Sequence, residues 1–176
     1  MAEIKSTLDI IMEKAKKYSV TDEEKKTFKR RELEGRIKGL IQKYVDALLD
    51  LDRFKMEMAA LEPGAQEKIA QVMRTETLKR VKPGVHNERL LEILSVAGMD
   101  TGPVQMLLRD FEERIHGEKA ICEKASLEKL REKGISGSAV LPNLDGDEGW
   151  LKAVSEAERD FREELKSLGP KNASSG

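Results

Sequence analysis

The sequence is poor in the residues that build disulfide-bonded, metal-binding or membrane-spanning proteins. Its single cysteine, Cys122, excludes an internal disulfide bond and any metal site that needs several cysteines. No apolar run approaches the roughly 20 residues needed to cross a bilayer. The opening MAEIKSTLDIIMEK contains acidic residues and lacks the apolar core of a secretory signal. These absences predict a cytoplasmic protein that does not associate with membranes.

Aromatic residues are also scarce, at 4% of the chain, and there is no excess of charge of one sign. The 32 basic residues nearly cancel the 33 acidic ones, so no overall basic field attracts nucleic acid or anionic lipid. What the chain has in abundance is charge, since 37% of its residues are Asp, Glu, Lys or Arg. This composition is typical of long helices around a thin aliphatic core.

Helical signals follow one another along the whole chain and predict an all-α fold. Capping boxes at Ser6–Asp9 and Thr21–Glu24 begin two helices, the first carrying apolar residues from Leu8 to Ala15. Further helices are expected at about 65–81, 87–97, 103–133 and 147–168, each ending near a Gly or a Pro-Gly pair. The sequence favours an elongated helical bundle, with no credible strand.

The clearest pattern is a heptad stripe between the second capping box and Pro63-Gly64. Spacings of four and three alternate through Leu33, Ile37, Leu40, Tyr44, Ala47, Leu51, Phe54, Met58 and Leu61. This predicts one continuous helix from about residue 22 to 61, roughly 60 Å long. Because a compact chain of this length is only about 40 Å across, either the molecule is elongated or this helix packs on another chain. The stripe is expected to carry a protein interface or the core. All of these residues except Ala47 and Leu61 make up the candidate interaction surface.

Two glycines, Gly35 and Gly39, lie four residues apart within this predicted helix, where each costs about 1 kcal/mol relative to alanine. They indicate either a notch for a second helix that approaches closely or two glycines that the helix tolerates. The sequence does not decide between these interpretations.

A neutral stretch precedes the last predicted helix. The eleven residues Gly134–Leu144, GISGSAVLPNL, carry no charge, and they lead to the only tryptophan. Loops of this length are often functional in compact domains. The apolar residues of this segment are expected either to pack on the bundle or to dock on a partner, and packing is favoured: Ile135, Val140, Leu141, Leu144 and Trp150.

No combination of residues predicts catalysis, a metal ion or a cofactor. Glu113 and His116 have the Glu-x-x-His spacing of carboxylate-bridged di-iron bundles, but a second such pair is missing, because the other histidine, His86, has Pro83 three residues before it. The acids around residues 143–147 lack the later ligands of a calcium loop and fit helix capping better. Cys122 is expected to be a small core residue. We therefore expect a protein that is not an enzyme.

A weaker alternative is a nucleic-acid-associated regulator. Residues 87–116 can be interpreted as helix, tight turn, helix, with Gln105 and Arg109 on the second helix. Basic groups at residues 25–31 and 74–82 would add phosphate contacts. Asp110, Glu112 and Glu113 lie on the same second helix and would repel phosphates, so nucleic-acid binding is not favoured.

The segments MAEIKSTLDIIMEK, ELEGRIKGL and GISGSAVLPNL resemble an uncharacterised family of small bacterial helical proteins, described only as a domain of unknown function. This resemblance implies a bacterial, soluble setting and no activity, ligand or site residue. Taken together, the sequence predicts an N-terminal helix and long heptad helix over 1–61, a helical bundle region packing with it over 62–168 and a disordered tail over 169–176. The expected function is a helical interaction or scaffold protein that binds a protein partner or a second copy of itself.

Overall fold

The computed structural model describes residues 21–169, and this part of the chain is entirely helical, without strands. The predicted all-α bundle is confirmed. The predicted first helix near Leu8–Ala15 and the tail 170–176 lie outside the described residues. The helices are α2 (Asp22–Val45), α3 (Leu51–Ala59), α4 (Gln66–Leu78), α5 (Glu88–Val96), α6 (Gly102–Glu132) and α7 (Glu148–Leu168).

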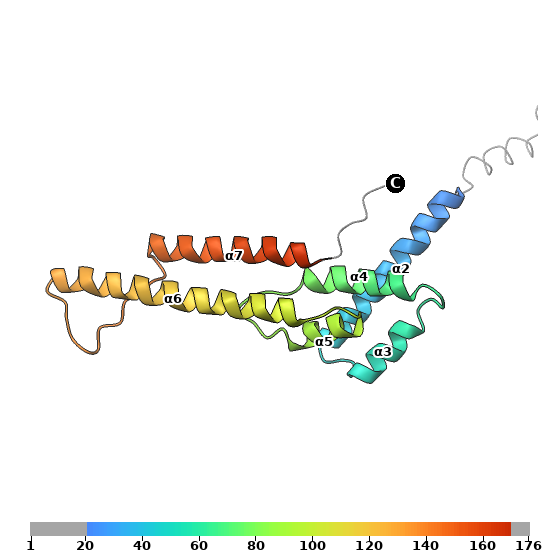
Figure 1. Ribbon diagram of the computed structural model, residues 1–176, viewed down its shortest axis with the longest axis horizontal. Helices are drawn as coiled ribbons and strands as arrows, with labels where there is room; N and C mark the ends of the chain where they lie inside the picture. The colour runs from blue at the N-terminus through green and yellow to red at the C-terminus, as the bar shows by residue number, and fades with distance from the viewer. Residues whose placement is uncertain (1–20, 170–176) are drawn as a thin grey trace, which may run out of the picture.

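Helix α2 begins at the predicted capping box. The backbone N–H of Glu24 donates to the Thr21 hydroxyl at 3.3 Å, and the backbone N–H of Thr21 donates to Glu24 Oε2 at 2.8 Å. The backbone N–H of Thr21 and its hydroxyl, at 3.0 Å, both donate to Glu24 Oε2, and these two hydrogen bonds lower the pKa of the Glu24 carboxyl. Residues 21–32 are all exposed, and the first half of α2 extends beyond the bundle (Figure 1).

The predicted continuous helix over 22–61 is wrong, because α2 ends at Val45 and a separate helix, α3, begins at Leu51. Ala47 adopts a left-handed φ of 62°, and the backbone N–H of Leu48 donates to the carbonyl of Lys43 at 2.9 Å, which closes α2. The side chain of Asp50 then caps α3 by accepting from the backbone N–H of Arg53 at 2.7 Å.

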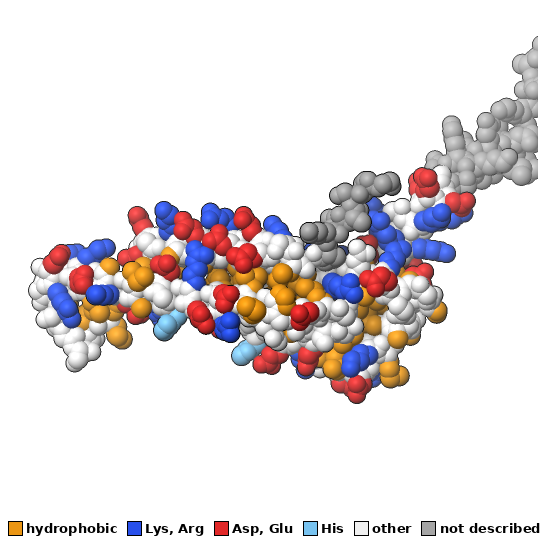
Figure 2. Space-filling view, viewed as in Figure 1, with side chains coloured by type: hydrophobic (Ala, Val, Ile, Leu, Met, Phe, Trp, Pro, Cys, Tyr) orange, Lys and Arg blue, Asp and Glu red, His pale blue; other side chains and the backbone are white. Residues whose placement is uncertain are grey.

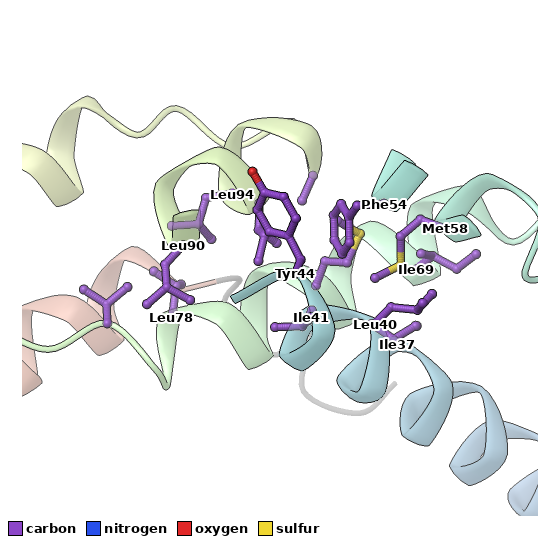
Figure 3. Packing of buried hydrophobic residues seen from close by; sticks show 14 of the residues in the cluster. Ile37, Leu40, Ile41, Tyr44, Phe54, Met58, Ile69, Leu78, Leu90 and Leu94 are labelled. Carbon is purple, nitrogen blue, oxygen red and sulfur yellow. The ribbon is translucent and has the colours of Figure 1, made fainter. Parts of the chain in front are cut away.

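Burial of the stripe's second half explains this break. A straight helix would carry Phe54 and Met58 away from the helices that cover Tyr44. The turn brings α3 back, so that Phe54 is 0% exposed and its ring centroid lies 5.0 Å from that of Tyr44 (Figure 3). Fully burying a phenylalanine stabilises a fold by about 1.5–3 kcal/mol, which offsets the strain at Ala47.

The bundle core lies where α2, α3, α4 and α5 meet, and aliphatic side chains fill most of it (Figure 3). Polar contacts hold α5 against the C-terminal turn of α2. The Tyr44 hydroxyl donates to the carboxylate of Glu92, while the Arg89 guanidinium donates to the Tyr44 carbonyl and lies 5.1 Å from the centre of the Tyr44 ring. On α4, Glu76 joins α2 to α4 through Lys38, at 3.5 Å.

The corner between α4 and α5 is held by one buried side chain. The amide of Asn87 donates to the carbonyls of Lys82, at 2.7 Å, and Val85, at 2.8 Å, and accepts from the Lys82 backbone N–H at 3.2 Å. Gly84 takes a left-handed φ of 73° within the same turn. These contacts fix the direction in which residues 79–83 leave α4.

Helices α6 and α7 form a long antiparallel hairpin that extends away from the α2–α5 bundle (Figure 1). Phe111 of α6 packs edge-on against Phe161 of α7, with ring centroids 5.7 Å apart. Next to them, the guanidinium of Arg114 donates to Asp160 at 2.8 Å, and this hydrogen bond lowers the pKa of the Asp160 carboxyl. The hairpin gives the described part of the molecule the elongated form that the sequence predicted.

Candidate interaction surfaces

Most of the heptad stripe lies in the core of the described chain. Leu51 is half-buried against this core, and the other six residues of the candidate interaction surface are buried: Leu33, Ile37, Leu40, Tyr44, Phe54 and Met58. The sequence left open whether the stripe forms an interface or a core. Because the helices of the same chain cover it, a second chain would reach these side chains only if the bundle opened.

The two glycines of α2 are not in close contact with another helix. A Cβ atom added at Gly35 or Gly39 would meet no described atom within 4 Å, apart from its own helix. Within residues 21–169, the closely approaching helix that these glycines suggested is therefore absent, and tolerated glycines fit the arrangement better.

The neutral loop before α7 is anchored at both ends. Gly134, with φ 78°, ends α6, and the backbone N–H of Ile135 donates to the Leu130 carbonyl at 3.0 Å. At the other end Leu144 is buried, at 7% exposed, and the carboxylate of Asp147 caps α7 by accepting from the Trp150 backbone N–H at 2.9 Å.

Between these anchors the loop is exposed. Leu141 is 87% exposed and Ile135 is 48% exposed, whereas Val140 and Trp150 are half-buried. The predicted packing therefore applies to Leu144 and in part to Val140, and the predicted docking segment corresponds to the tip around Leu141. We call Ile135 and Leu141, with the neutral residues between them, the hairpin tip.

The residues considered for chemistry do not converge. Among residues 21–169, no three His, Cys, Asp or Glu side chains are arranged to hold a metal ion. Asp147 serves as a helix cap, and His116 is exposed on α6. Cys122 is half-buried, and burial together with the charge of Asp147 raises the pKa of its thiol. This environment favours the protonated thiol over the reactive thiolate.

The two helices of the helix-turn-helix-like segment, residues 87–116, pack mainly on other helices and not on each other. Its first helix, α5, packs mainly on α4 and α2, while its second helix, α6, packs on α7. Arg109 is exposed but lies 3.7 Å from both Asp110 and Glu113. The exposed face of α6 at this point thus carries both signs of charge.

The structure shows one surface that the sequence did not predict, a groove where the hairpin joins the bundle. Its volume is about 760 Å³, and it is open to solvent. Two segments line it, residues 75–83 at the end of α4 and residues 158–169 of α7. We call it the α4–α7 groove. Because its two walls lie about 80 residues apart in sequence, local patterns cannot reveal it.

No protein-family model, no curated protein and no solved structure matches this chain. The resemblance to an uncharacterised bacterial helical family therefore stays a prediction. No helix within the described residues has both the length and the apolar character that a membrane span requires.

Proposed function

We propose that this protein is a non-enzymatic interaction protein that binds a protein partner through its α6–α7 hairpin. The observation that carries the proposal is the exposed apolar tip of a long projecting arm. Helix α6 has 31 residues, and only Val104, next to the bundle, is buried within the described structure. Most of the hairpin therefore adds little to the bundle core, and its length serves to place the tip far from it.

The tip is suited to binding because it is apolar, neutral and shaped in advance. Leu141 offers an aliphatic side chain to solvent, and none of the residues from Gly134 to Leu144 is charged, so docking desolvates no ion. The anchors at Gly134 and Leu144 hold both ends of the loop. A loop that is already ordered loses less conformational entropy when a partner binds.

The buried heptad stripe favours a different protein as partner over a second copy of the chain. The residues that would form a coiled-coil dimer seam already fill the intramolecular core. The exposed apolar residues of the hairpin, with Leu141 the most exposed of them, are available for contact with another protein.

Affinity capture from extracts of the source cells tests this proposal, with the wild type, Leu141→Glu and Met56→Glu compared by quantitative mass spectrometry. Met56 is the matched control, because it is an exposed apolar residue on α3, away from the hairpin. We expect a partner whose capture falls about tenfold or more with Leu141→Glu, about 1.4 kcal/mol in binding free energy, and is unchanged with Met56→Glu.

The captured partner is then purified and titrated directly against the same three proteins. The proposal is wrong if no captured protein depends on Leu141, or if both substitutions reduce capture equally. Circular dichroism of each variant confirms that the helical fold is retained before the comparison is made.

A further inference from the structure

The α4–α7 groove combines an apolar floor with charged rims. The floor consists of side chains that also belong to the core, namely Leu78 and Val81 on one side and Phe161 and Leu165 on the other. Figure 2 shows hydrophobic side chains gathered where the hairpin meets the bundle. A groove of this kind can accept apolar side chains from outside without disturbing the packing beneath it.

Positive charge dominates the rims. Lys79 and Lys82 lie on the α4 side, Arg162 and Lys166 lie on the α7 side, and Glu158 is the acidic residue of the lining. The chain as a whole has slightly more acidic than basic residues. The groove is thus a local concentration of cations within a protein of balanced charge.

Two of these cations are already paired and two are available. Lys79 contacts Glu76 at 2.8 Å, and Arg162 contacts Glu158 at 3.3 Å. Lys82 and Lys166 have no carboxylate within 4.0 Å among the described residues. The partial negative charge at the C-terminal ends of α4 and α7 attracts nearby lysines. This weak attraction leaves the ammonium groups of Lys82 and Lys166 free to bind an external anion.

The shape of the groove indicates how long an occupant it accepts. The α7 wall contributes Glu158, Phe161, Arg162, Leu165, Lys166 and Gly169, which follow helical spacing along one face. From residue 158 to residue 169 this face is about 16 Å long. A helix of about three turns has the same length and presents apolar residues at matching intervals.

We propose that the α4–α7 groove binds an acidic amphipathic helix of a partner protein. Its apolar face would lie on the floor formed by Leu78, Val81, Phe161 and Leu165, and its carboxylates would pair with Lys82 and Lys166. The inference rests on the proposed function in assuming a protein partner, but it concerns a surface separate from the hairpin tip.

Fluorescence anisotropy with a synthetic peptide tests the inference on the full chain. The probe is a labelled amphipathic peptide of about 14 residues, with leucines on one helical face and glutamates on the other. The control peptide has lysine at every glutamate position. We expect saturable binding of the glutamate peptide alone, weakened when NaCl is raised from about 50 mM to about 500 mM.

The double variant Lys82→Glu/Lys166→Glu is expected to weaken this binding about tenfold or more, whereas Lys152→Glu leaves it unchanged. Lys152 is the matched control, because it is an exposed lysine of α7 outside the groove and is paired with Glu156 at 4.0 Å. Leu141→Glu is also expected to leave peptide binding unchanged, since the hairpin tip is not part of the groove.

Three results would overturn the inference: no saturable binding at peptide concentrations up to about 1 mM, equal binding of the lysine peptide, or no effect of the double variant. Displacement of the peptide by an equal concentration of dodecanoate would assign the groove to a small amphiphile instead. Binding of duplex DNA that the double variant abolishes would assign it to nucleic acid. If the peptide fails while Leu141→Glu still abolishes partner capture, the groove inference is wrong and the proposed function stands.

Discussion

Replacing Ala47 by glycine tests the turn that folds the heptad stripe into a core. Ala47 has a φ of 62°, in the left-handed region that residues with a Cβ atom rarely occupy. It lies between the last turn of α2 and the Asp50 cap of α3. Glycine adopts this conformation without steric strain.

The expected change is a gain in stability. The left-handed conformation costs an L-residue about 1–2 kcal/mol, and glycine removes that cost. Glycine also gives the unfolded chain more freedom, which costs about 0.4–1 kcal/mol. The net expectation for Ala47→Gly is about 0.5–1 kcal/mol in favour of the folded state. In a continuous helix, the same substitution would cost about 1 kcal/mol, so the sign of the change distinguishes the two geometries.

Urea unfolding monitored by circular dichroism gives the free energy of unfolding of each protein. Ala120→Gly is the matched control, because Ala120 is exposed in the middle of α6 and should lose about 1 kcal/mol. If Ala47→Gly is destabilised as much as Ala120→Gly, the left-handed turn at Ala47 is refuted.

Three further predictions concern buried polar groups. Thr77 is 0% exposed, and its hydroxyl has no hydrogen-bond partner among residues 21–169, so Thr77→Val should raise the free energy of unfolding by about 1 kcal/mol; a loss would show that the hydroxyl is satisfied. Asn87→Ala removes the hydrogen bonds of the α4–α5 corner and should cost about 2 kcal/mol in the same assay, whereas a neutral result would contradict the role of this amide. Burial, then the hydrogen bond to Glu92, raises the pKa of Tyr44 to about 12 from the ordinary value of 10.0. The stability that the neutral Tyr44 hydroxyl contributes is therefore complete below pH 10 and is lost as pH rises through about 12. The difference in phenolate absorbance between the wild type and Tyr44→Phe, recorded with unfolding measurements over the same pH range, should show ionisation of Tyr44 near pH 12; ionisation near pH 10 would contradict the prediction.

Local sequence signals predicted most helix boundaries well. The helix expected at about 147–168 is found at Glu148–Leu168, and the one expected at about 87–97 is found at Glu88–Val96. Gly98 and Gly134 both have the positive φ that a helix C-terminus needs. These boundaries depend on capping residues and glycines, whose effects are local, so a single sequence is enough to place them.

The turn between α2 and α3 could not be predicted in this way. The heptad spacing continues from Tyr44 through Ala47 to Leu51 and Phe54 without a missed position, so the pattern gives no sign of a break. Ala47 is a strong helix former, and its left-handed conformation is held by the burial of Phe54 against Tyr44. Contacts between separate helices determine where α2 ends, and such contacts also create the α4–α7 groove.

Solution mass and size provide the most direct test of the central claim, that the heptad stripe is an intramolecular core and the hairpin a free arm. Light scattering after size exclusion gives the mass, and small-angle X-ray scattering gives the radius of gyration. The account predicts a monomer of 19.8 kDa with a radius of gyration clearly above the value of about 16 Å for a compact chain of this length. A dimer that persists on dilution, or a monomer with a radius near the compact value, would contradict it.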